Sequence, residues 1–341
     1  MDSRQRVLAA LNREPVDRPP VISPTSVATV ESMKLCGAEF PSAHYDAKKT
    51  AALASAGREL LGFDCVAPYF SITAEAAALG AKINPGSLDI MPSVAARPFS
   101  EPDEFEMPDD FLSREPVKTL LDSIRILKEK YGERSESPAA VCGKVIGPWT
   151  LSYNLYGTEN FLMDVVAEPE RAKAFLQAFK IISLTFAKAQ VEAGADMLTW
   201  ADHATGDMVS AGVYEEFLLP VHIECARELK KILPRRTPVI LHCCGKALDR
   251  IKLFAETGFD VFHFDSKNDP REALSLAGDK ILLAGCVNNV EVLQNGTPGD
   301  VKRQTREILR AGVPLIAPEC AVPCGVKNKN LRAIAEAVKE Y

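Results

Sequence analysis

The sequence predicts an α/β fold in which eight parallel strands alternate with helices and form a (β/α)8 TIM barrel. Short runs rich in β-branched residues recur eight times, and the segments between them have apolar side chains at helical spacing. The length of 341 residues suits one such barrel with modest insertions. A right-handed crossover is assumed for each strand-helix unit. The eight runs are residues 21–22, 65–67, 139–146, 197–200, 239–241, 261–264, 281–284 and 315–317.

The N-terminal segment 3–12 is predicted to be a helix. Val7, Leu8 and Leu11 share one of its faces, and the proline-rich segment 14–20 ends it. We expect this helix to form a cap ahead of the first strand.

The later helices carry recognisable start signals. Pro169 is suited to the first turn of a long amphipathic helix. The Thr-Pro-Gly-Asp sequence at 297–300 predicts a cap for a helix over 301–310, and Asn330 is the predicted cap of a last helix over 331–340.

The segment 80–110 departs from the alternation of strands and helices. It is rich in Pro, Asp and Glu, so we expect a short insertion that holds a hairpin and a surface loop. No internal repeat, low-complexity tract or linker is visible, which favours a single domain over residues 1–341.

Composition excludes several classes of function. The chain is 47% hydrophobic and 25% charged, with a net charge of −6, and its cations are interspersed, so no nucleic-acid surface is predicted. No apolar run is long enough to cross a bilayer, and we expect a cytoplasmic protein without a membrane partner. Nine cysteines without a secretory signal favour reduced thiols or metal ligands over disulfides.

The stretch 239–245, Val-Ile-Leu-His-Cys-Cys-Gly, is the strongest candidate site. Alternation along a strand places His242 and Cys244 on one face and Cys243 on the other. Cys320 ends another apolar run at a second strand end, and parallel barrel strands end on one face. Three N and S ligands leave one position of a zinc tetrahedron open, as in catalytic zinc sites.

Polar residues follow other predicted strands in the same way. Asp202 and His203 follow the fourth strand, Asp265 the sixth, and Asn288 and Asn289 the seventh. We expect them to lie at the active-site face, where barrel enzymes carry their catalytic groups. Aspartate after a strand also commonly caps the next helix, so both roles remain open for the two aspartates.

The other histidines and cysteines have simpler interpretations. His222 lies in a helical pattern and is predicted to be structural, and His263 lies mid-strand as a hydrogen-bonded residue of the barrel interior. Cys324 is an alternative ligand to Cys320, although it lies further into the loop. The remaining cysteines are expected to be small buried apolar residues: Cys36, Cys65, Cys142, Cys225 and Cys286.

Five motifs together resemble the uroporphyrinogen decarboxylase superfamily. His242-x-Cys244 with Cys320 is similar to the zinc motif of the methylcobamide:coenzyme M methyltransferases, enzymes of methanogens that grow on methanol or methylamines. The five motifs lie at residues 6–20, 147–150, 241–245, 284–289 and 317–320.

The resemblance implies that zinc on His242, Cys244 and Cys320 binds a substrate thiol, with coenzyme M as the expected acceptor. The substrate thiolate, not a protein side chain, attacks the methyl group of a methylated corrinoid (cobamide), and cobalt leaves as Co(I). A separate partner protein carries this corrinoid.

Related enzymes have an acidic residue where this chain has Asp265, which makes it the candidate for a fourth ligand or for a hydrogen-bond partner of a ligand. Trp149 completes the candidates for the substrate and corrinoid pocket, together with Lys267. No sulfonate-binding residue is identified from the sequence, and Lys267 is only a candidate for that role.

Three alternatives remain open. The first is a corrinoid-linked methyltransferase with another acceptor or donor, such as tetrahydrofolate or homocysteine. The second is uroporphyrinogen decarboxylase, whose polycarboxylate substrate needs several cations near the first strand, whereas residues 21–45 contain only Lys34. The third is a non-enzymatic accessory protein that holds zinc or a corrinoid.

Overall fold

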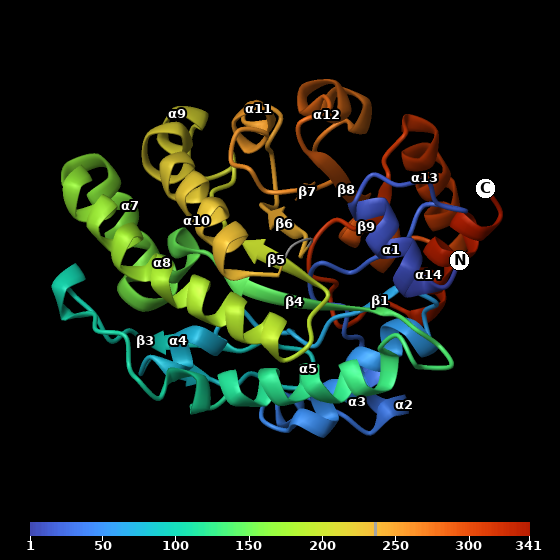
Figure 1. The fold of residues 1–341 in the computed structure, drawn as a ribbon, viewed down its shortest axis with the longest axis horizontal. Helices are drawn as coiled ribbons and strands as arrows, with labels where there is room; N and C mark the ends of the chain where they lie inside the picture. The colour runs from blue at the N-terminus through green and yellow to red at the C-terminus, as the bar shows by residue number, and fades with distance from the viewer. Residues whose placement is uncertain (235–236) are drawn as a thin grey trace.

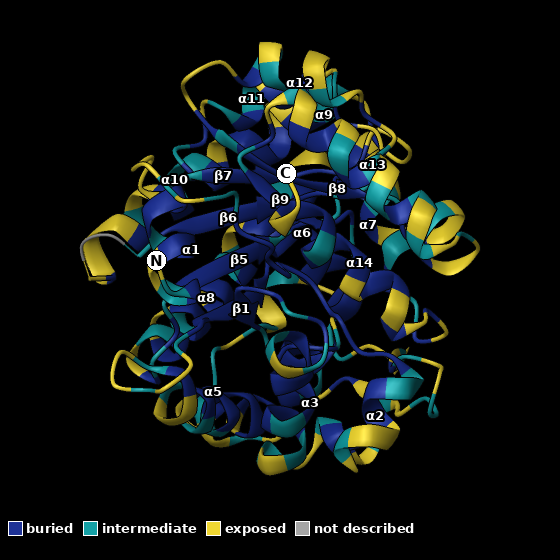
Figure 2. Ribbon diagram, turned by 90° about the vertical axis from the view of Figure 1, so that its right-hand side faces the viewer, coloured by how far each residue is buried: buried dark blue, intermediate teal, exposed yellow. Residues whose placement is uncertain are grey.

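Seven parallel strands form the central sheet of the computed structural model, which describes residues 1–234 and 237–341. Helices lie outside this sheet (Figure 1), and the strands are buried (Figure 2). In sheet order the strands are β1 Cys65–Val66, β4 Ala140–Ile146, β5 Met197–Ala201, β6 Val239–His242, β7 Val261–His263, β8 Leu282–Val287 and β9 Leu315–Pro318.

The predicted first strand is a single bridge and not a full strand. Val21 pairs with Ile316, and the backbone N–H of Ile22 donates to the Ile316 carbonyl at 2.8 Å. On the other side, the N–H of Asp64 donates to the Val21 carbonyl at 2.7 Å, so this segment contacts both edges of the sheet. The ladder stays short because Pro20 has no N–H to donate. The result is a barrel-like arrangement of seven strands and one bridging segment.

Several helices pack against each other in pairs around the sheet: α3 with α5, α8 with α10, and α13 with α14. The helices are α1 Ser3–Leu11, α2 Val30–Cys36, α3 Ala47–Glu59, α4 Ala74–Ala78, α5 Val117–Tyr131, α6 Pro148–Ser152, α7 Thr158–Ala167, α8 Pro169–Glu192, α9 Ala211–Val213, α10 Leu219–Ile232, α11 Ile251–Phe254, α12 Pro270–Ala277, α13 Pro298–Ala311 and α14 Asn328–Lys339. Short 3-10 turns lie at Ser42–His44, Pro102–Glu104 and Phe111–Ser113, and π-helical turns at Tyr153–Gly157, Tyr214–Leu218 and Asn289–Gln294.

The inner face of the sheet is apolar toward the amino ends of its strands. Val7, Ala10 and Leu11 of α1 pack in one buried cluster with side chains from β1 and β4 to β9. This packing fills one end of the sheet with hydrocarbon and leaves the carboxyl ends of the strands for polar groups. None of the helices in the described ranges is long and apolar enough to cross a membrane.

The start signals of two helices act as predicted, and a third does not. α8 begins at Pro169, and Thr297 and Asp300 form a reciprocal capping box at the start of α13. Asn330 lies inside α14, which begins two residues earlier, so the predicted cap was wrong. Its amide instead donates to the carbonyls of Leu293 and Gly296 at 2.9 Å each and links α14 to the segment that precedes α13.

The segment 80–110 contains the predicted hairpin. β2 (Lys82–Asn84) and β3 (Ser93–Ala96) pair antiparallel in a separate two-stranded sheet, and most of their residues are exposed. The insertion therefore adds nothing to the central sheet.

A buried carboxylate fixes the N-terminal segment against β1. Asp64 accepts hydrogen bonds from Ser3 Oγ at 2.7 Å, from Arg6 and Arg18 at 2.8 Å each and from the N–H of Val21 at 2.9 Å. Burial alone raises the pKa of Asp64, but the hydrogen bonds from Arg18 and Ser3 outweigh burial and hold the pKa below its ordinary value. The charged form is therefore the one that the fold stabilises.

We predict that Asp64→Ala lowers the free energy of unfolding by about 3–5 kcal/mol, because it leaves two arginines without their buried counter-charge. Asp17→Ala removes a carboxylate that also pairs with Arg6 but is 43% exposed, and should cost about 1 kcal/mol or less. Urea denaturation of both variants measures the difference. Equal losses would contradict the role given to the buried carboxylate.

Candidate metal centre

Three possible metal ligands meet at the carboxyl ends of β6 and β9. His242 is the last residue of β6, Cys244 lies two residues later, and Cys320 lies two residues after the end of β9. Their donor atoms all lie within 4.8 Å of one another, and Cys320 Sγ is 3.4 Å from His242 Nε2. One imidazole and two thiols suit zinc better than magnesium or calcium, so the residues present fit the metal that the motif implies.

Cys243 lies outside this group of donor atoms. Its side chain is only 2% exposed, and burial raises the pKa of its thiol to about 12. β6 ends at His242, and the chain turns at Gly245, whose φ of 84° is a left-handed conformation that glycine adopts without strain. The two adjacent cysteines are thus separated as expected, although they follow the strand and are not part of it.

Hydrogen bonds fix which nitrogen of His242 is free to bind a metal. His263 Nε2 lies 2.8 Å from the Pro318 carbonyl, which can only accept, so this nitrogen carries the proton. Burial, with a smaller contribution from the adjacent His242, lowers the pKa of His263 to about 3, so the ring is neutral and its Nδ1 accepts. His242 Nδ1, 2.9 Å away, must then donate. The lone pair of His242 Nε2 is therefore left facing Cys320.

The two thiols of the group differ in acidity. The Cys244 thiol donates a hydrogen bond to Cys320, and together with the neighbouring His242 this holds the pKa of Cys320 well below its ordinary value. The same hydrogen bond and burial raise the pKa of Cys244. His203 Nδ1 lies 3.0 Å from Cys244 Sγ, and burial lowers the pKa of His203. Cys320 is thus the more acidic of the two thiols.

A cavity of about 380 Å³ opens directly onto these donors. Asp202 and His203, both predicted from the sequence, lie on its wall. Lys144 also lines the cavity and was missed, although a lysine within the apolar strand 140–146 was a visible signal. The other lining residues are Thr25, Ile72, Ile146, Thr150, Tyr153, Asn154, Thr158, Ala201, His242, Cys244, Cys320 and Ala321.

Asp202 and His222 form a buried polar pair behind the cavity wall. His222 Nε2 lies 3.0 Å from one Asp202 oxygen, and the Thr150 N–H donates to the other at 2.7 Å. Tyr214 Oη lies 2.9 Å from the second nitrogen of His222. His222 therefore has the structural role predicted for it, and Asp202 holds the N-terminal turn of α6.

Asp265 lies behind the ligand loop and outside the group of three donors. Its two oxygens accept from the N–H groups of Gly245, at 3.1 Å, and Lys267, at 2.9 Å. It does not cap the next helix, because Asp269 accepts the N-terminal hydrogen bonds of α12. Its contact with Gly245 fixes the backbone beside Cys244.

Neither Trp149 nor Lys267 lines the cavity. Trp149 is fully buried, and its indole N–H donates to Tyr153 Oη, so it supports a wall residue from behind. Lys267 is 54% exposed and forms an ion pair with Asp207 at 2.9 Å.

The two asparagines after β8 also lie outside the cavity and hold loops. Asn288 accepts from the N–H groups of Val290 and Glu291 and so caps the π-helical turn that follows. The Asn289 amide donates to the Ala321 carbonyl at 2.9 Å, next to Cys320. This hydrogen bond fixes the loop that carries the third donor.

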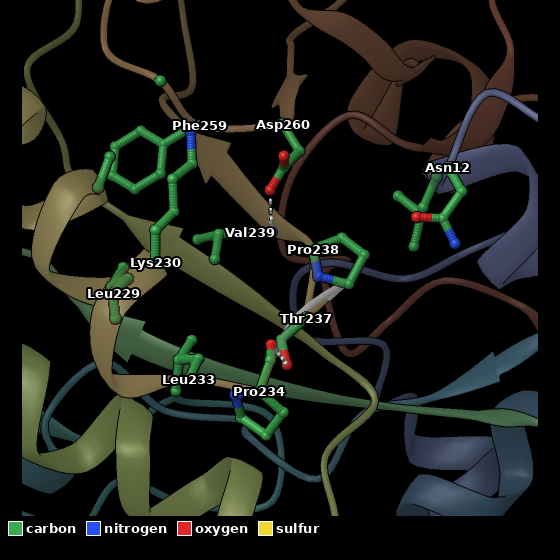
Figure 3. A pocket seen from close by; sticks show the side chains of 13 residues that line it. Asn12, Leu229, Lys230, Leu233, Pro234, Thr237, Pro238, Val239, Phe259 and Asp260 are labelled. Atoms are coloured by element: carbon green, nitrogen blue, oxygen red, sulfur yellow. Dashed lines mark hydrogen bonds between the residues drawn. The ribbon is translucent and has the colours of Figure 1, made fainter.

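A second cavity, of about 250 Å³, lies at the opposite ends of the strands (Figure 3). Asp260 on its wall already accepts from the Val239 N–H at 2.8 Å. No histidine or cysteine contributes to the lining that the structure describes, so this cavity offers no comparable chemistry.

Comparison with known proteins identifies the family. The model of the family described as uroporphyrinogen decarboxylase (URO-D) matches residues 2–341. The chain belongs to the URO-D family. Within similar proteins, the methylcobamide:CoM methyltransferase MtbA of Methanosarcina acetivorans is 32% identical over 340 residues, which cover 99% of this chain and 98% of that protein.

Two further relatives agree along the whole chain. The methylated-thiol–coenzyme M methyltransferase of Methanosarcina mazei is 30% identical over 341 residues, with 100% of this chain and 90% of that protein covered. A solved structure described as a methyltransferase from Methanosarcina mazei superposes with a TM-score of 0.93 at 28% identity, covering 100% of this chain and 99% of that one. The fold of this chain is thus closely similar to that of a methyltransferase.

We predict that Cys244→Ser loses most of the bound zinc, because a hydroxyl is a poor substitute for a thiolate ligand. Cys243→Ser is the matched control: it should keep about one zinc per chain and lose at most about 1–2 kcal/mol of stability through a buried hydroxyl. Elemental analysis of the two purified variants decides. The reverse pattern would mean that the other face of the strand carries the ligands.

His263→Leu should weaken zinc binding by about 10- to 100-fold, because it removes the nearer acceptor of the His242 Nδ1 proton, at 2.9 Å, and leaves only the His263 backbone carbonyl at 3.3 Å. His263→Gln keeps an acceptor oxygen and should lose less. Competition with a chromogenic chelator gives both affinities. An unchanged affinity in the leucine variant would show that the hydrogen bond between the two histidines does not prepare the ligand.

Proposed function

We propose that this chain is a methyltransferase that moves a methyl group from a methylated corrinoid protein to a thiol, with coenzyme M as the preferred acceptor. Zinc held by His242, Cys244 and Cys320 is its resident metal in this proposal. The observation that carries the proposal is the meeting of these three donors on the wall of a cavity large enough for a small thiol. The full-length relatives, whose names specify methylcobamide and coenzyme M, support the same reaction.

The charge of the cavity favours this reaction over decarboxylation of a porphyrinogen. Among the described residues that line it, Lys144 is the single lysine or arginine. A substrate with many carboxylates needs several fixed cations, whereas a small thiol with one anionic group needs at most one. The residues near the first strand add only Lys34, which lies in α2 and is exposed.

The side chains have complementary parts in the reaction. Bound zinc would act as a Lewis acid that lowers the pKa of a thiol at its open position, from about 8.5 toward neutrality. His203 lines the cavity with Nδ1 3.0 Å from Cys244 Sγ, which makes it the group positioned to take the thiol proton. The sulfur electron pair then forms the bond to the methyl carbon, and the cobalt-carbon bond breaks with both electrons left on cobalt.

The corrinoid arrives from outside the chain, carried by a partner protein. Alignment of sulfur, methyl carbon and cobalt is the main contribution that the cavity can make to the displacement. The thiol would enter first and bind with its sulfur at the three donors, and the corrinoid would then close the cavity from outside.

The test is methyl transfer from methylcobalamin to a panel of acceptors, with zinc measured on the same sample. We expect thiol-dependent conversion of methylcobalamin to Co(I), followed by its absorbance, that is lost on chelation and restored by zinc. Tetrahydrofolate and homocysteine serve as competing acceptors, and uroporphyrinogen as the competing substrate. Full activity in a metal-free preparation, or decarboxylation of uroporphyrinogen, would overturn the proposal.

A further inference from the structure

Lys144 is a cation in the interior of the sheet. It lies in the middle of β4 and shares its inward face with Cys142 and Ile146, since side chains two apart point the same way. The residue is 5% exposed, and burial lowers the pKa of Lys144 to about 8, so its side chain is mostly charged at neutral pH. A charge in this position is costly unless something compensates it.

The described part of the protein gives the Lys144 ammonium no carboxylate partner. Its recorded contact is the face of Tyr69, with Nζ 4.5 Å from the ring centroid. Glu75 is the nearby carboxyl group, but its oxygens already accept from Tyr69 Oη and from the Ile146 N–H. Burial also raises the pKa of Glu75 to about 7, so it carries only part of a negative charge. Among the described residues the buried ammonium thus forms no ion pair with a carboxylate, although Cys320 and Glu75 lie near enough for their charge to raise its pKa.

The same lysine lines the cavity that contains the metal ligands. The strand register relates the position of Lys144 to that of the metal ligands. Ile146 pairs with Ala201, and Ala201 pairs with His242, so these three residues lie at the same level of the sheet. Lys144 lies two residues before Ile146 on β4, which is about 7 Å along a strand. The cavity therefore has thiol-binding donors in one layer and a cation in the layer beneath it.

We propose that Lys144 binds the anionic group, a sulfonate or a carboxylate, of the acceptor thiol. This inference rests on the proposed function, because it assumes that the sulfur of the acceptor lies at the three donors. The separation of about one strand repeat suits a thiol whose anionic group is two or three carbons from sulfur. Thr25, Thr150 and Asn154 line the same cavity and can donate further hydrogen bonds to the anion.

The competing explanation is that Lys144 serves only as a counter-charge for Cys320 and Glu75. A counter-charge would affect every thiol equally, whereas an anion-binding residue affects only thiols that carry an anion. The two explanations therefore differ in substrate selectivity and not merely in rate.

The experiment compares the wild-type protein with Lys144→Met, a variant of similar length without charge. The acceptors are 2-mercaptoethanesulfonate and 3-mercaptopropionate, which are anionic, and 2-mercaptoethanol and ethanethiol, which are neutral. We expect the substitution to raise KM for the anionic thiols by about 10- to 100-fold, as loss of a charge-assisted hydrogen bond implies, and to change KM for the neutral thiols by about twofold or less. Zinc content should not change.

Two control variants test whether any lysine has the same effect. Lys188→Met removes an exposed charge on α8 and should leave the ratio of KM values unchanged. Lys267→Met tests the exposed lysine beside the ligand loop, and a loss of anion preference there instead of in Lys144→Met would overturn the inference. So would an equal loss of rate with all four thiols in Lys144→Met.

A binding measurement separates this inference from the proposed function. Ethanesulfonate has the anion but no thiol, and calorimetry should detect its binding to the wild-type protein and not to Lys144→Met, whatever the methyltransferase activity. If the wild-type protein methylates no thiol yet binds ethanesulfonate through Lys144, the proposed function fails and the anion site stands.

A second variant covers the case in which Lys144→Met does not fold. Lys144→Arg keeps the charge and should therefore keep the preference of the wild-type protein for anionic thiols. If neither the wild-type protein nor Lys144→Arg prefers anionic thiols, the inference is overturned.

Discussion

The contact between His242 Nε2 and Cys320 Sγ, at 3.4 Å, depends on the parallel register of four neighbouring strands. β6 and β9 are separated in the sheet by β7 and β8, and only the curvature of the sheet brings their carboxyl ends within reach of each other. A change of register in either of the two intervening strands would separate the donors. The metal centre is therefore a property of the whole sheet and not of one loop.

Backbone hydrogen bonds then give the converged side chains their chemical states. The Pro318 carbonyl fixes the proton on His263, and His263 fixes the proton on His242, so the end of β9 decides which nitrogen of a β6 residue is free. Asp265 and Asn289 hold the loops that carry Cys244 and Cys320. His263, Asp265 and Asn289 are not among the described residues that line the cavity, yet they determine how well the donors are preorganised for a metal.

The sequence was informative where a short pattern determines geometry. Alternation along 239–245 separates Cys243 from Cys244, the spacing at 297–300 predicts a capping box, and Asp202 and His203 lie on the cavity wall as strand-end residues should. The same reasoning cannot tell a residue that faces the cavity from one that supports it, because both follow a strand.

For this reason, some residues that the sequence assigned to the pocket lie elsewhere in the structure. Asn288 and Asn289 follow β8 as expected, but their amides are used by nearby backbone groups, which no periodicity records. Lys144 shows the opposite case: a charge within a buried strand was visible, but its meaning depends on neighbours far away in the sequence. The short bridge at Val21 likewise depends on partners almost 300 residues away.

The measurement that tests the central claim most directly is X-ray absorption at the zinc edge, with and without an acceptor thiol. The account predicts two sulfur ligands at about 2.3 Å with nitrogen or oxygen at about 2.0–2.1 Å in the zinc-loaded protein, and a third sulfur after addition of the thiol. Four sulfur ligands at rest, or a sulfur count that stays at two when a methyl-accepting thiol is present, would contradict it.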